Sequence, residues 1–176
     1  FTTEASFIPQ DGDAGKPFGG GYFMRHMLDE QGVEYALVVS PKAEGDPGGM
    51  LTWQNAIDFA AALTIGGRSD WKLPDMDEMF ILYREIKPST DSDATWYGAT
   101  DRVDPPLGNY TSSDPSRTSL TEFQLGKSES FRTDWYWSAT EYDYKDARNV
   151  RFGNGSIGSA DKGGGYYVRA VRRVYL

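Results

Sequence analysis

The sequence predicts an α+β fold, on three observations. Segments in which apolar and polar residues alternate lie towards both ends of the chain, at 22–27, 34–40 and 135–172, and a period of two is typical of strands. Two segments with helical spacing of apolar residues, 52–64 and 75–87, lie between them. Strands and helices are thus separated along the chain rather than alternating, which favours α+β over α/β.

The length of the chain indicates one domain. With 176 residues, of which 39% are hydrophobic, it can bury one core of ordinary size. We expect a single domain over 1–176, with an N-terminal loop at 1–20, an insertion loop at 88–134 and a strand meander at 135–174. Because the chain begins with Phe1 rather than Met, we expect a processed form or an excised fragment.

The N-terminal region predicts a hairpin after its opening loop. Residues 22–27 and 34–40 form two candidate strands, and the polar residues 29–32 between them are a plausible turn. The charged, glycine-rich residues 41–49 then predict a loop. Alternate apolar residues of the second strand share one face and predict its buried side: Tyr35, Leu37 and Val39.

The middle of the chain predicts two helices. Thr52 is a good N-cap for the first, and Gly66-Gly67 supply its C-terminal stop after about residue 64. Asp75 and Glu78 have the spacing of a capping box at the start of the second helix, which Lys87-Pro88 end. The apolar stripe of the second helix predicts core rather than a cofactor site and consists of Met76, Met79, Phe80, Tyr83 and Ile86.

Residues 88–134 show no lasting period and are dominated by Asp, Ser, Thr, Pro and Gly. A segment this long without regular structure is unusual in a compact domain, so we expect an ordered, functional insertion. Its scattered aromatic residues predict the points that attach it to the body: Trp96, Tyr97, Tyr110, Phe123 and Phe131.

The C-terminal third predicts a strand meander at 135–140, 150–152 and 167–172, with a turn at Asn154-Gly155. Between these strands the chain is rich in tyrosine, serine, glycine and aspartate, with some asparagine, a composition that resembles antibody binding loops. In such loops tyrosine gives rigid contact area, while the small polar residues give adaptable hydrogen bonds. The pattern indicates binding rather than chemistry.

The charge of the chain is unevenly distributed. A net charge of −8 argues against general nucleic-acid binding. From residue 145 onwards, however, seven cations face only two acids, so an anionic ligand for this face is one interpretation and paired strand arginines are the other. The cations are Lys145, Arg148, Arg151, Lys162, Arg169, Arg172 and Arg173.

Several kinds of chemistry have little support in the sequence, so we do not expect an enzyme. The chain has no cysteine, which excludes a disulfide, a thiolate zinc site and a cysteine nucleophile. His26 is the sole histidine and has no nucleophile motif nearby. The 26 acids are too many for a pair of hydrolytic carboxylates to be recognised without their separation in space.

Metals and membranes are expected to play little part. Asp11-Gly12-Asp13 has the start of a calcium-loop spacing, but the later ligands do not follow. We expect no cofactor, although a structural calcium ion held by clustered acids stays an open alternative. The longest apolar run is far shorter than a membrane span, so we expect no membrane insertion.

A set of motifs in a fixed order resembles the family of the Legionella collagen-like adhesin C-terminal domain. The resemblance covers 20–174, and the family's domain is also found in many bacterial and phage surface proteins. The motifs are Trp53 at a helix start, Gly-Arg-Ser-Asp-Trp-Lys-Leu-Pro at 67–74 followed by Glu78, Trp-Ser-Ala-Thr-Glu at 137–141, Val-Arg-Phe at 150–152 with Gly155, and Tyr-Val-Arg-Ala-Val-Arg at 167–172.

The chain departs from the family pattern at a few places. Asp75 stands where the family has Thr, and Lys72 where it has Arg, which keeps the cap and the cation. Leu63 and Ala170 stand where some relatives have cysteines, which removes a disulfide but not the fold.

The resemblance implies a C-type-lectin-like fold, related to the formylglycine-generating enzymes and to the variable proteins of diversity-generating retroelements. The enzymatic activity depends on cysteine and does not carry over. On this fold the following residues are expected in a core that positions loops: Trp71, Leu73, Trp135, Trp137 and Val168.

In the retroelement-diversified relatives, substitution of adenines in Asn codons changes side chains in this C-terminal third. The resulting residues include Tyr, Asp, Ser, Gly, Arg and Ala but not Lys or Glu, so Glu141, Lys145 and Lys162 would be fixed. The candidate ligand-binding residues fit that alphabet: Tyr142, Asp143, Tyr144, Asn149, Arg151, Gly153, Ser156, Ser159, Asp161 and Tyr166.

We therefore expect a recognition domain of a phage tail or bacterial surface protein, located on a virion tail or outside the cell. Its partner would be a protein or glycan receptor on a cell surface. Two alternatives stay open: a glycosaminoglycan- or glycan-binding adhesin that uses the C-terminal cations, and a structural or oligomerisation tip module. A homotrimer formed through a region upstream of Phe1 also stays open.

Overall fold

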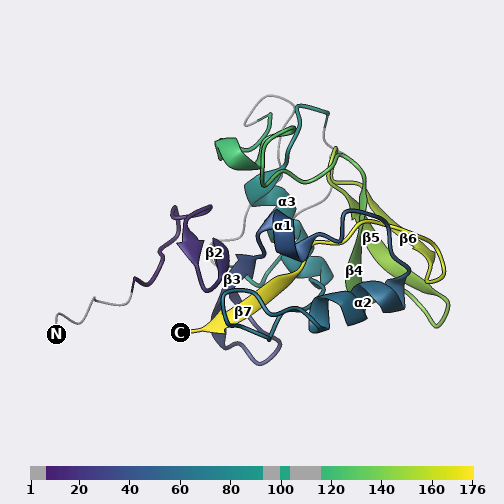
Figure 1. The fold of residues 1–176 in the computed structure, drawn as a ribbon, viewed down its shortest axis with the longest axis horizontal. Helices are drawn as coiled ribbons and strands as arrows, with labels where there is room; N and C mark the ends of the chain where they lie inside the picture. Colours follow the sequence, from purple (N-terminus) through teal and green to yellow (C-terminus); the bar gives the residue numbers. More distant parts are fainter. Residues whose placement is uncertain (1–6, 93–99, 104–115) are drawn as a thin grey trace.

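The computed structural model describes residues 7–92, 100–103 and 116–176. In this part of the chain the structure has three helices and two antiparallel sheets, so the α+β prediction is confirmed (Figure 1). The elements are β1 (Pro17–Phe18), β2 (Gly21–Leu28), β3 (Glu34–Val39), α1 (Lys42–Gly45), α2 (Trp53–Ala61), α3 (Met76–Ile86), the 3-10 helix η1 (Thr121–Phe123), β4 (Trp135–Glu141), β5 (Asp146–Arg151), β6 (Ile157–Asp161) and β7 (Val171–Tyr175).

The first sheet has the order β1-β2-β3-β7 and joins the N-terminal hairpin to the end of the chain. The predicted hairpin is confirmed, since β2 and β3 pair antiparallel with Met27 opposite Tyr35. Strand β7 adds to the other side of β3, with Tyr175 opposite Tyr35. In β2 the buried residues are Gly21, Phe23, Met24 and Met27. Strand β3 is buried continuously from Tyr35 to Val39, so both of its faces are covered and not only the predicted one, and it lies between β2 and β7 in the sheet.

The second sheet has the order β4-β5-β6. The predicted strand 135–140 corresponds to β4, but β5 begins at Asp146 rather than at 150, and β6 lies in a stretch predicted to form a loop. The predicted strand 167–172 is divided between the two sheets. Tyr167 lies parallel to Tyr136 at the outer edge of β4, whereas β7 begins at Val171 in the first sheet. Tyr167 stays with the second sheet because its backbone exchanges hydrogen bonds with Trp135 and Trp137, each at 3.0 Å.

Both predicted helices are present. At the start of α3 the capping box is complete, since Asp75 accepts a hydrogen bond from the Glu78 amide and Glu78 accepts one from the Asp75 amide, both at 2.9 Å. Helix α2 begins after Thr52 as predicted, although the Thr52 side chain makes no capping bond. It ends at Ala61, before Gly66 and Gly67, and the short helix α1 lies in the predicted loop 41–49.

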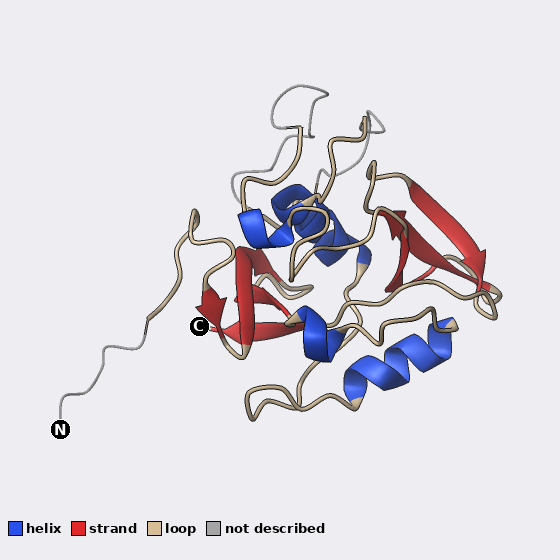
Figure 2. Ribbon diagram, turned by 45° about the horizontal axis from the view of Figure 1, so that its top comes forward, coloured by secondary structure: helices blue, strands red, loops and turns tan. Residues whose placement is uncertain are grey.

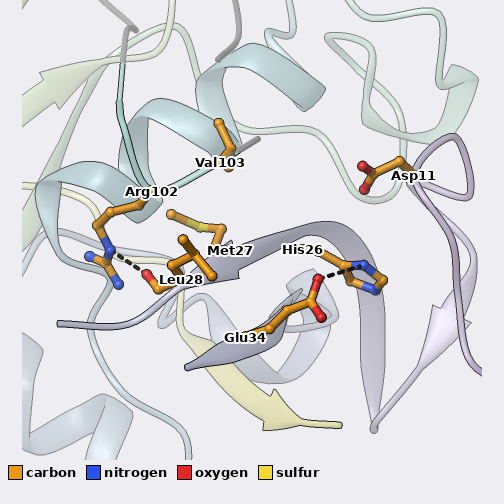
Figure 3. Close-up of a pocket in the computed structure, with 7 residues that line it drawn as sticks. All are labelled: Asp11, His26, Met27, Leu28, Glu34, Arg102 and Val103. Carbon is orange, nitrogen blue, oxygen red and sulfur yellow. Dashed lines mark hydrogen bonds and ion pairs between the residues drawn. The ribbon is translucent and has the colours of Figure 1, made fainter. Parts of the chain in front are cut away.

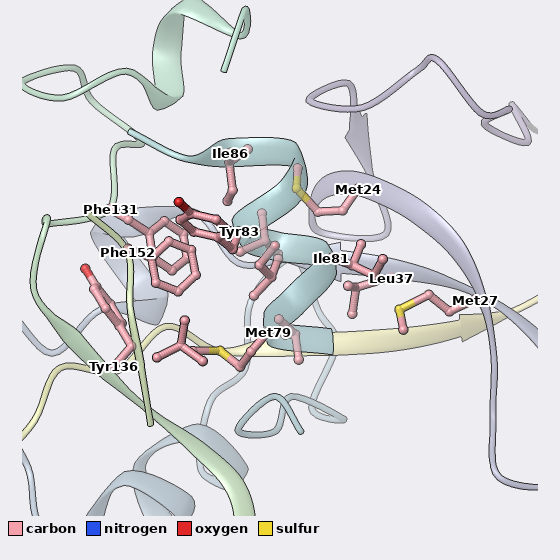
Figure 4. Close-up of a cluster of buried hydrophobic side chains, with 14 of the residues drawn as sticks. Met24, Met27, Leu37, Met79, Ile81, Tyr83, Ile86, Phe131, Tyr136 and Phe152 are labelled. Atoms are coloured by element: carbon pink, nitrogen blue, oxygen red, sulfur yellow. The ribbon is translucent and has the colours of Figure 1, made fainter. Parts of the chain in front are cut away.

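Helix α3 lies between the two sheets and its apolar face fills the main core (Figures 2 and 4). Met79, Ile81 and Ile86 are almost fully buried against residues of β2, β3 and β5. At the second sheet the core is aromatic, with the rings of Phe131 and Phe152 stacked at a centroid distance of 4.3 Å. The stacked pair attaches the end of the long loop to the sheet.

A second cluster contains Trp53 of α2 together with three residues that the resemblance placed in a core, Trp137, Leu73 and Val168, whereas Trp71 lies in a third cluster. Trp53 donates to the Ser138 carbonyl and Trp137 donates to the Leu51 carbonyl, both at 2.8 Å. Trp71, Leu73 and Val168 are buried as well, so the structure agrees with the core expected for these residues. The exception is Trp135, which is only partly buried. These bonds hold α2 against the inner face of the second sheet.

The long loop is attached to the body at several described points. Phe123 and Phe131 are buried, as predicted, whereas Trp96, Tyr97 and Tyr110 lie outside the described residues. Arg102 donates to the Leu28 carbonyl at 2.6 Å and pairs with Asp75 at 2.9 Å. The described part of the insertion is therefore ordered and packed on both the first sheet and α3.

Candidate functional site

The loop between β4 and β5, residues 142–145, presents two exposed phenols at the end of the second sheet. Tyr144 is 91% exposed and Tyr142 is 54% exposed. The guanidinium of Arg148 lies over the Tyr142 ring, 4.3 Å from its centroid. We call residues 142–145 the tip loop. The tip loop and Arg148 together present one cation and two aromatic rings, those of Tyr142 and Tyr144, to a partner.

Lys162 fixes the position of the tip loop. Its ammonium donates to the carbonyl of Asp143 at 3.0 Å, to the carbonyl of Tyr144 at 3.1 Å and to the Glu141 carboxylate at 2.8 Å. The same ammonium lies 4.8 Å from the Trp53 ring centroid. The two exposed phenols therefore project from a backbone that is held by buried and half-buried groups.

Asp143 forms the turn of the tip loop rather than a free contact. Its carboxylate accepts hydrogen bonds from the amides of Asp146 and Lys145, each at 2.8 Å. These backbone bonds lower the pKa of Asp143 below its ordinary value, because they favour the charged form. The carboxylate is nevertheless exposed, so it adds negative charge to the tip.

The remaining exposed candidates lie on β5 and β6. Ser159 and Asp161 are exposed on β6, and Arg151 is exposed at the end of β5, whereas Ser156 is half-buried. Asp161 lies 3.7 Å from the Lys145 ammonium. Arg151 lines a polar hollow of about 370 Å³ together with Asp91, Ser92, Gly153 and Asn154.

Three predicted contact residues are not on the exposed surface. Asn149 is only 3% exposed, because it lies in the middle strand opposite Trp137 and Gly158. Gly153 is buried, and a Cβ there would lie 2.9 Å from the Thr133 carbonyl. Tyr166 is half-buried and packs edge-on against Trp137 at a centroid distance of 4.7 Å. The prediction of a freely exposed contact is therefore wrong for Asn149, Gly153 and the ring of Tyr166.

Arg148 is a half-buried residue of this surface that the sequence analysis named among the C-terminal cations but not among the candidate ligand-binding residues. It lies directly opposite Ser159 in the β5–β6 ladder. Only the alternation of β5 could have identified it, because 148 and 150 share the face opposite to that of 147 and 149. That alternation does not show which face α2 covers.

Most of the C-terminal cations are paired with acids. Arg169 is 2% exposed and bonds the Glu129 carboxylate at 2.8 Å, and its burial lowers its pKa. Arg172 pairs with Asp70 at 2.8 Å. Arg173 pairs with Glu30, Asp75 and Glu78. Within the described residues, Arg148 and Arg151 have no carboxylate partner, so the paired interpretation holds for the last strand.

A second hollow, of about 380 Å³, lies beside the sole histidine (Figure 3). His26 Nδ1 lies 3.6 Å from Glu34 Oε1. The lining residues are Asp11, His26, Met27, Leu28, Glu34, Arg102 and Val103, and none of these carries the hydroxyl or thiol that a catalytic triad requires. The guanidinium of Arg102 is already bonded to Leu28 and Asp75.

The described residues offer little to a metal ion. No group of three or more His, Cys, Asp or Glu comes together there to hold one. Asp13, in the candidate calcium-loop fragment, accepts bonds from the Gln10 amide and the Lys16 ammonium. None of the helices in this part of the chain has the length and apolar character needed to cross a bilayer.

Comparison with known protein families identifies the family of this domain. The family model described as the Lcl C-terminal domain matches residues 40–172, a range that contains α2, α3, the whole second sheet and the tip loop. No curated protein matches the chain.

Proposed function

This chain belongs to the Lcl C-terminal domain family, and we propose that it is an adhesin-type recognition domain that binds a receptor outside the cell. The family is consistent with a surface adhesin-type domain. The proposed contact area, which we call the tip surface, consists of Tyr142, Tyr144, Arg148, Ser159 and Asp161.

The observation that carries the proposal is the exposure of the tip phenols on a fixed backbone. A phenol that is 91% exposed contributes little to the core, and burying it in an interface recovers a large apolar area. Since Lys162 holds the carbonyls of Asp143 and Tyr144 in place, binding need not order the loop. A pre-ordered aromatic loop is the arrangement that binding surfaces favour.

We propose binding rather than catalysis as the activity of this site. The groups of the tip surface are phenols, one hydroxyl and ions, and none of its residues lines either of the two hollows described above. Catalytic sites are usually concave. The histidine-lined hollow lies in the first sheet, away from the tip loop (Figures 1 and 3). The partner we propose is a protein or glycan receptor on a cell surface.

A finer proposal is a C-type-lectin-like variable protein of a phage tail or bacterial surface. Its support is that the residues expected to be fixed and those expected to vary have different roles at the tip. Glu141 and Lys162, which would be fixed, form the ion pair that holds the loop, whereas the exposed side chains are of types that adenine substitution can produce. Tyr142 and Tyr144 are the displayed residues of that kind with the largest exposure. The buried positions of Asn149 and Gly153 limit how many sites such variation would use.

A glycosaminoglycan-binding adhesin is the first alternative. The positive surface available for it is smaller than the sequence indicates, because Arg169, Arg172 and Arg173 are paired with carboxylates. Binding through Lys145, Arg148 and Arg151 would still weaken steeply with salt. The alternative of a structural tip module predicts instead that substitutions of the tip phenols change the oligomeric state and leave receptor binding intact.

The experiment is retention of the purified domain on host-cell monolayers and on a glycan array. We expect the double variant Tyr142→Ala/Tyr144→Ala to bind at least about tenfold more weakly than the wild type. Tyr175→Ala is the matched control, since Tyr175 is 53% exposed at the end of the first sheet and lies outside the tip surface. Equal losses in both variants, or no loss in the double variant, contradict the proposal.

A further inference from the structure

Strand β6 leaves one side of its backbone unpaired. The ladder to β5 runs without a break from Asp146 opposite Asp161 to Val150 opposite Ile157. Just beyond it, Arg151 donates to the Ser156 carbonyl at 2.8 Å and Lys162 donates to the Lys145 carbonyl at 3.0 Å. Hydrogen-bonded positions alternate along an antiparallel ladder, so 158 and 160 face β5, and 157, 159 and 161 face outwards.

The outward groups have almost no partners in the described part of the chain. The amides of Ile157, Ser159 and Asp161 and the carbonyls of Ile157 and Ser159 are unbonded there, while the Asp161 carbonyl accepts from the Gly164 amide at 2.8 Å. Ser159 is also exposed. An unpaired row of this kind is a template for another strand.

The outer edges of β4 and β7 differ from that of β6. The edge of β4 is covered, because Trp137 donates to the Tyr167 carbonyl at 3.0 Å and Ala139 donates to the Pro74 carbonyl at 2.7 Å. The edge of β7 is paired at Val171 with Lys72 and carries two arginines, a common protection against strand addition. By contrast, β6 has the sequence Ile-Gly-Ser-Ala-Asp, without proline, lysine or a bulge.

The charge beside this edge is mixed, with one cation that lacks a carboxylate partner in the described chain, Arg148, and an acid on the same face, Asp161, which lies 3.7 Å from the Lys145 ammonium. Arg148 lies opposite Ser159 at a position that makes no ladder bonds, where cross-strand side chains are closest. The Arg148 guanidinium lies over the Tyr142 ring, and because Ser159 is short, a guanidinium that leaves this ring can extend past Ser159 to a strand beyond β6. Arg148 has no carboxylate partner among the described residues, and Ile157 is half-buried on the same face.

We propose that the free edge of β6 binds an extended segment of a partner protein as a fourth, antiparallel strand. The segment places a carboxylate opposite Ser159, within reach of Arg148, and an aliphatic side chain two positions later, opposite Ile157. Main-chain hydrogen bonds supply the pairing, and the two side chains supply the selectivity. The inference rests on the proposed function, receptor binding through the tip surface. It specifies that the receptor is a protein and extends the tip surface along β6.

The first experiment uses the wild-type domain and hydrogen exchange of its backbone amides measured by NMR. Without a partner, Gly158 and Ala160 should exchange slowly, while Ile157, Ser159 and Asp161 should exchange fast. The probe is a short labelled peptide in which valine and threonine alternate around a central glutamate. At saturation the three fast amides should slow at least about tenfold. Binding that leaves them fast overturns strand addition, as does no binding up to about 1 mM.

The second experiment uses variants and fluorescence anisotropy with the same peptide. Ser159→Pro deletes an outward amide without removing a ladder bond and should abolish saturable binding. Ser159→Ala removes a hydroxyl of the tip surface but keeps the amide, so it should retain saturable binding. Arg148→Gln should weaken the glutamate peptide about tenfold and leave a matched glutamine peptide unchanged. Equal effects of Arg148→Gln on both peptides overturn the proposed charge recognition.

The two proposals fail separately. If receptor binding needs Tyr142 and Tyr144 but the Ser159 amide never gains protection, the recognition surface stands and strand addition falls. If the peptide pairs with β6 while the tyrosine variants bind the receptor normally, strand addition stands and the tip surface falls.

Discussion

The ammonium of Lys162 lies 2.8 Å from the carboxylate of Glu141 and also donates to two backbone carbonyls of the tip loop, those of Asp143 and Tyr144. These two residues are 21 positions apart in the sequence and join the start of the tip loop to the end of β6. The loop therefore has a defined shape before any partner arrives.

Replacing Lys162 should loosen the tip loop. Lys162→Met removes three hydrogen bonds and keeps most of the side-chain volume, so we expect a loss of about 1 kcal/mol in unfolding free energy and faster amide exchange at 143–146. Lys145→Met is the control, because Lys145 pairs with Asp161 at 3.7 Å and both side chains are exposed. Chemical denaturation and hydrogen exchange measure the two effects. Equal changes in unfolding free energy and amide exchange in the two variants would show that the hydrogen bonds of Lys162 do not stabilise the tip loop.

Gly155 should be intolerant of any side chain. It has φ +73°, and a Cβ there would lie 2.7 Å from the Tyr83 ring. Gly155→Ala therefore combines backbone strain of about 1 kcal/mol with overpacking of about 1–3 kcal/mol. Gly126→Ala separates the two effects, since Gly126 has φ +85° with no atom within 4 Å of such a Cβ. A similar loss of unfolding free energy in both variants would contradict the role of the Tyr83 contact.

Glu78 should be essential to stability, because it is a fully buried charge. It bonds Arg173 at 2.7 Å, accepts from the Asp75 amide at 2.9 Å and pairs with Lys72. Glu78→Gln keeps the shape but removes the carboxylate partner of Lys72 and one of the three carboxylates around Arg173, at a cost of about 3 kcal/mol. Asp77→Asn is the control, since Asp77 is 40% exposed and lies 3.4 Å from Arg102. Urea denaturation measures both, and a near-neutral Glu78→Gln would contradict the account of this network.

The stability of the fold should fall in acid. Hydrogen bonds from Arg173 lower the pKa of Glu30 to about 2, and the Arg172 pair lowers the pKa of Asp70. A lowered folded-state pKa gives stability that is present above the unfolded value and is lost as the pH falls through the folded value. The relevant window for Glu30 is thus from its ordinary pKa of 4.5 down to about 2.

Thermal melts between about pH 7 and about pH 2 check this expectation. Glu30→Gln should melt lower than the wild type at neutral pH and converge with it at the acid end. Glu44→Gln is the control, because Glu44 is exposed and has no ion pair in the described residues. Burial raises the pKa of Glu85, which acts in the opposite direction, since its contribution is lost as the pH rises. Parallel melting curves for Glu30→Gln and the wild type would contradict the prediction.

The features that could be predicted from the sequence are mostly local. The capping box of Asp75 and Glu78 involves residues three apart, and the β2–β3 hairpin joins neighbouring segments. The choice of partner for the last strand could not be predicted, because a period of two does not show which sheet a strand joins. Tyr167 and Val171 therefore pair in different sheets, although they lie within one alternating segment.

The candidate site could be predicted where exposure follows from loop composition and not where it depends on packing. Tyr142 and Tyr144 lie in a short loop and are exposed. Asn149 has the same polar character but lies in a middle strand, on the face that the second core cluster covers. Arg148 was missed for the converse reason, since its exposure depends on the register with Ser159.

The central claim is that the tip phenols serve binding and not folding. The most direct test measures urea unfolding and receptor binding on the same Tyr142→Ala/Tyr144→Ala protein. We expect the unfolding free energy to stay within about 0.5 kcal/mol of the wild type while binding falls at least about tenfold. A destabilised protein, or a stable one that binds its receptor as well as the wild type does, would contradict the account.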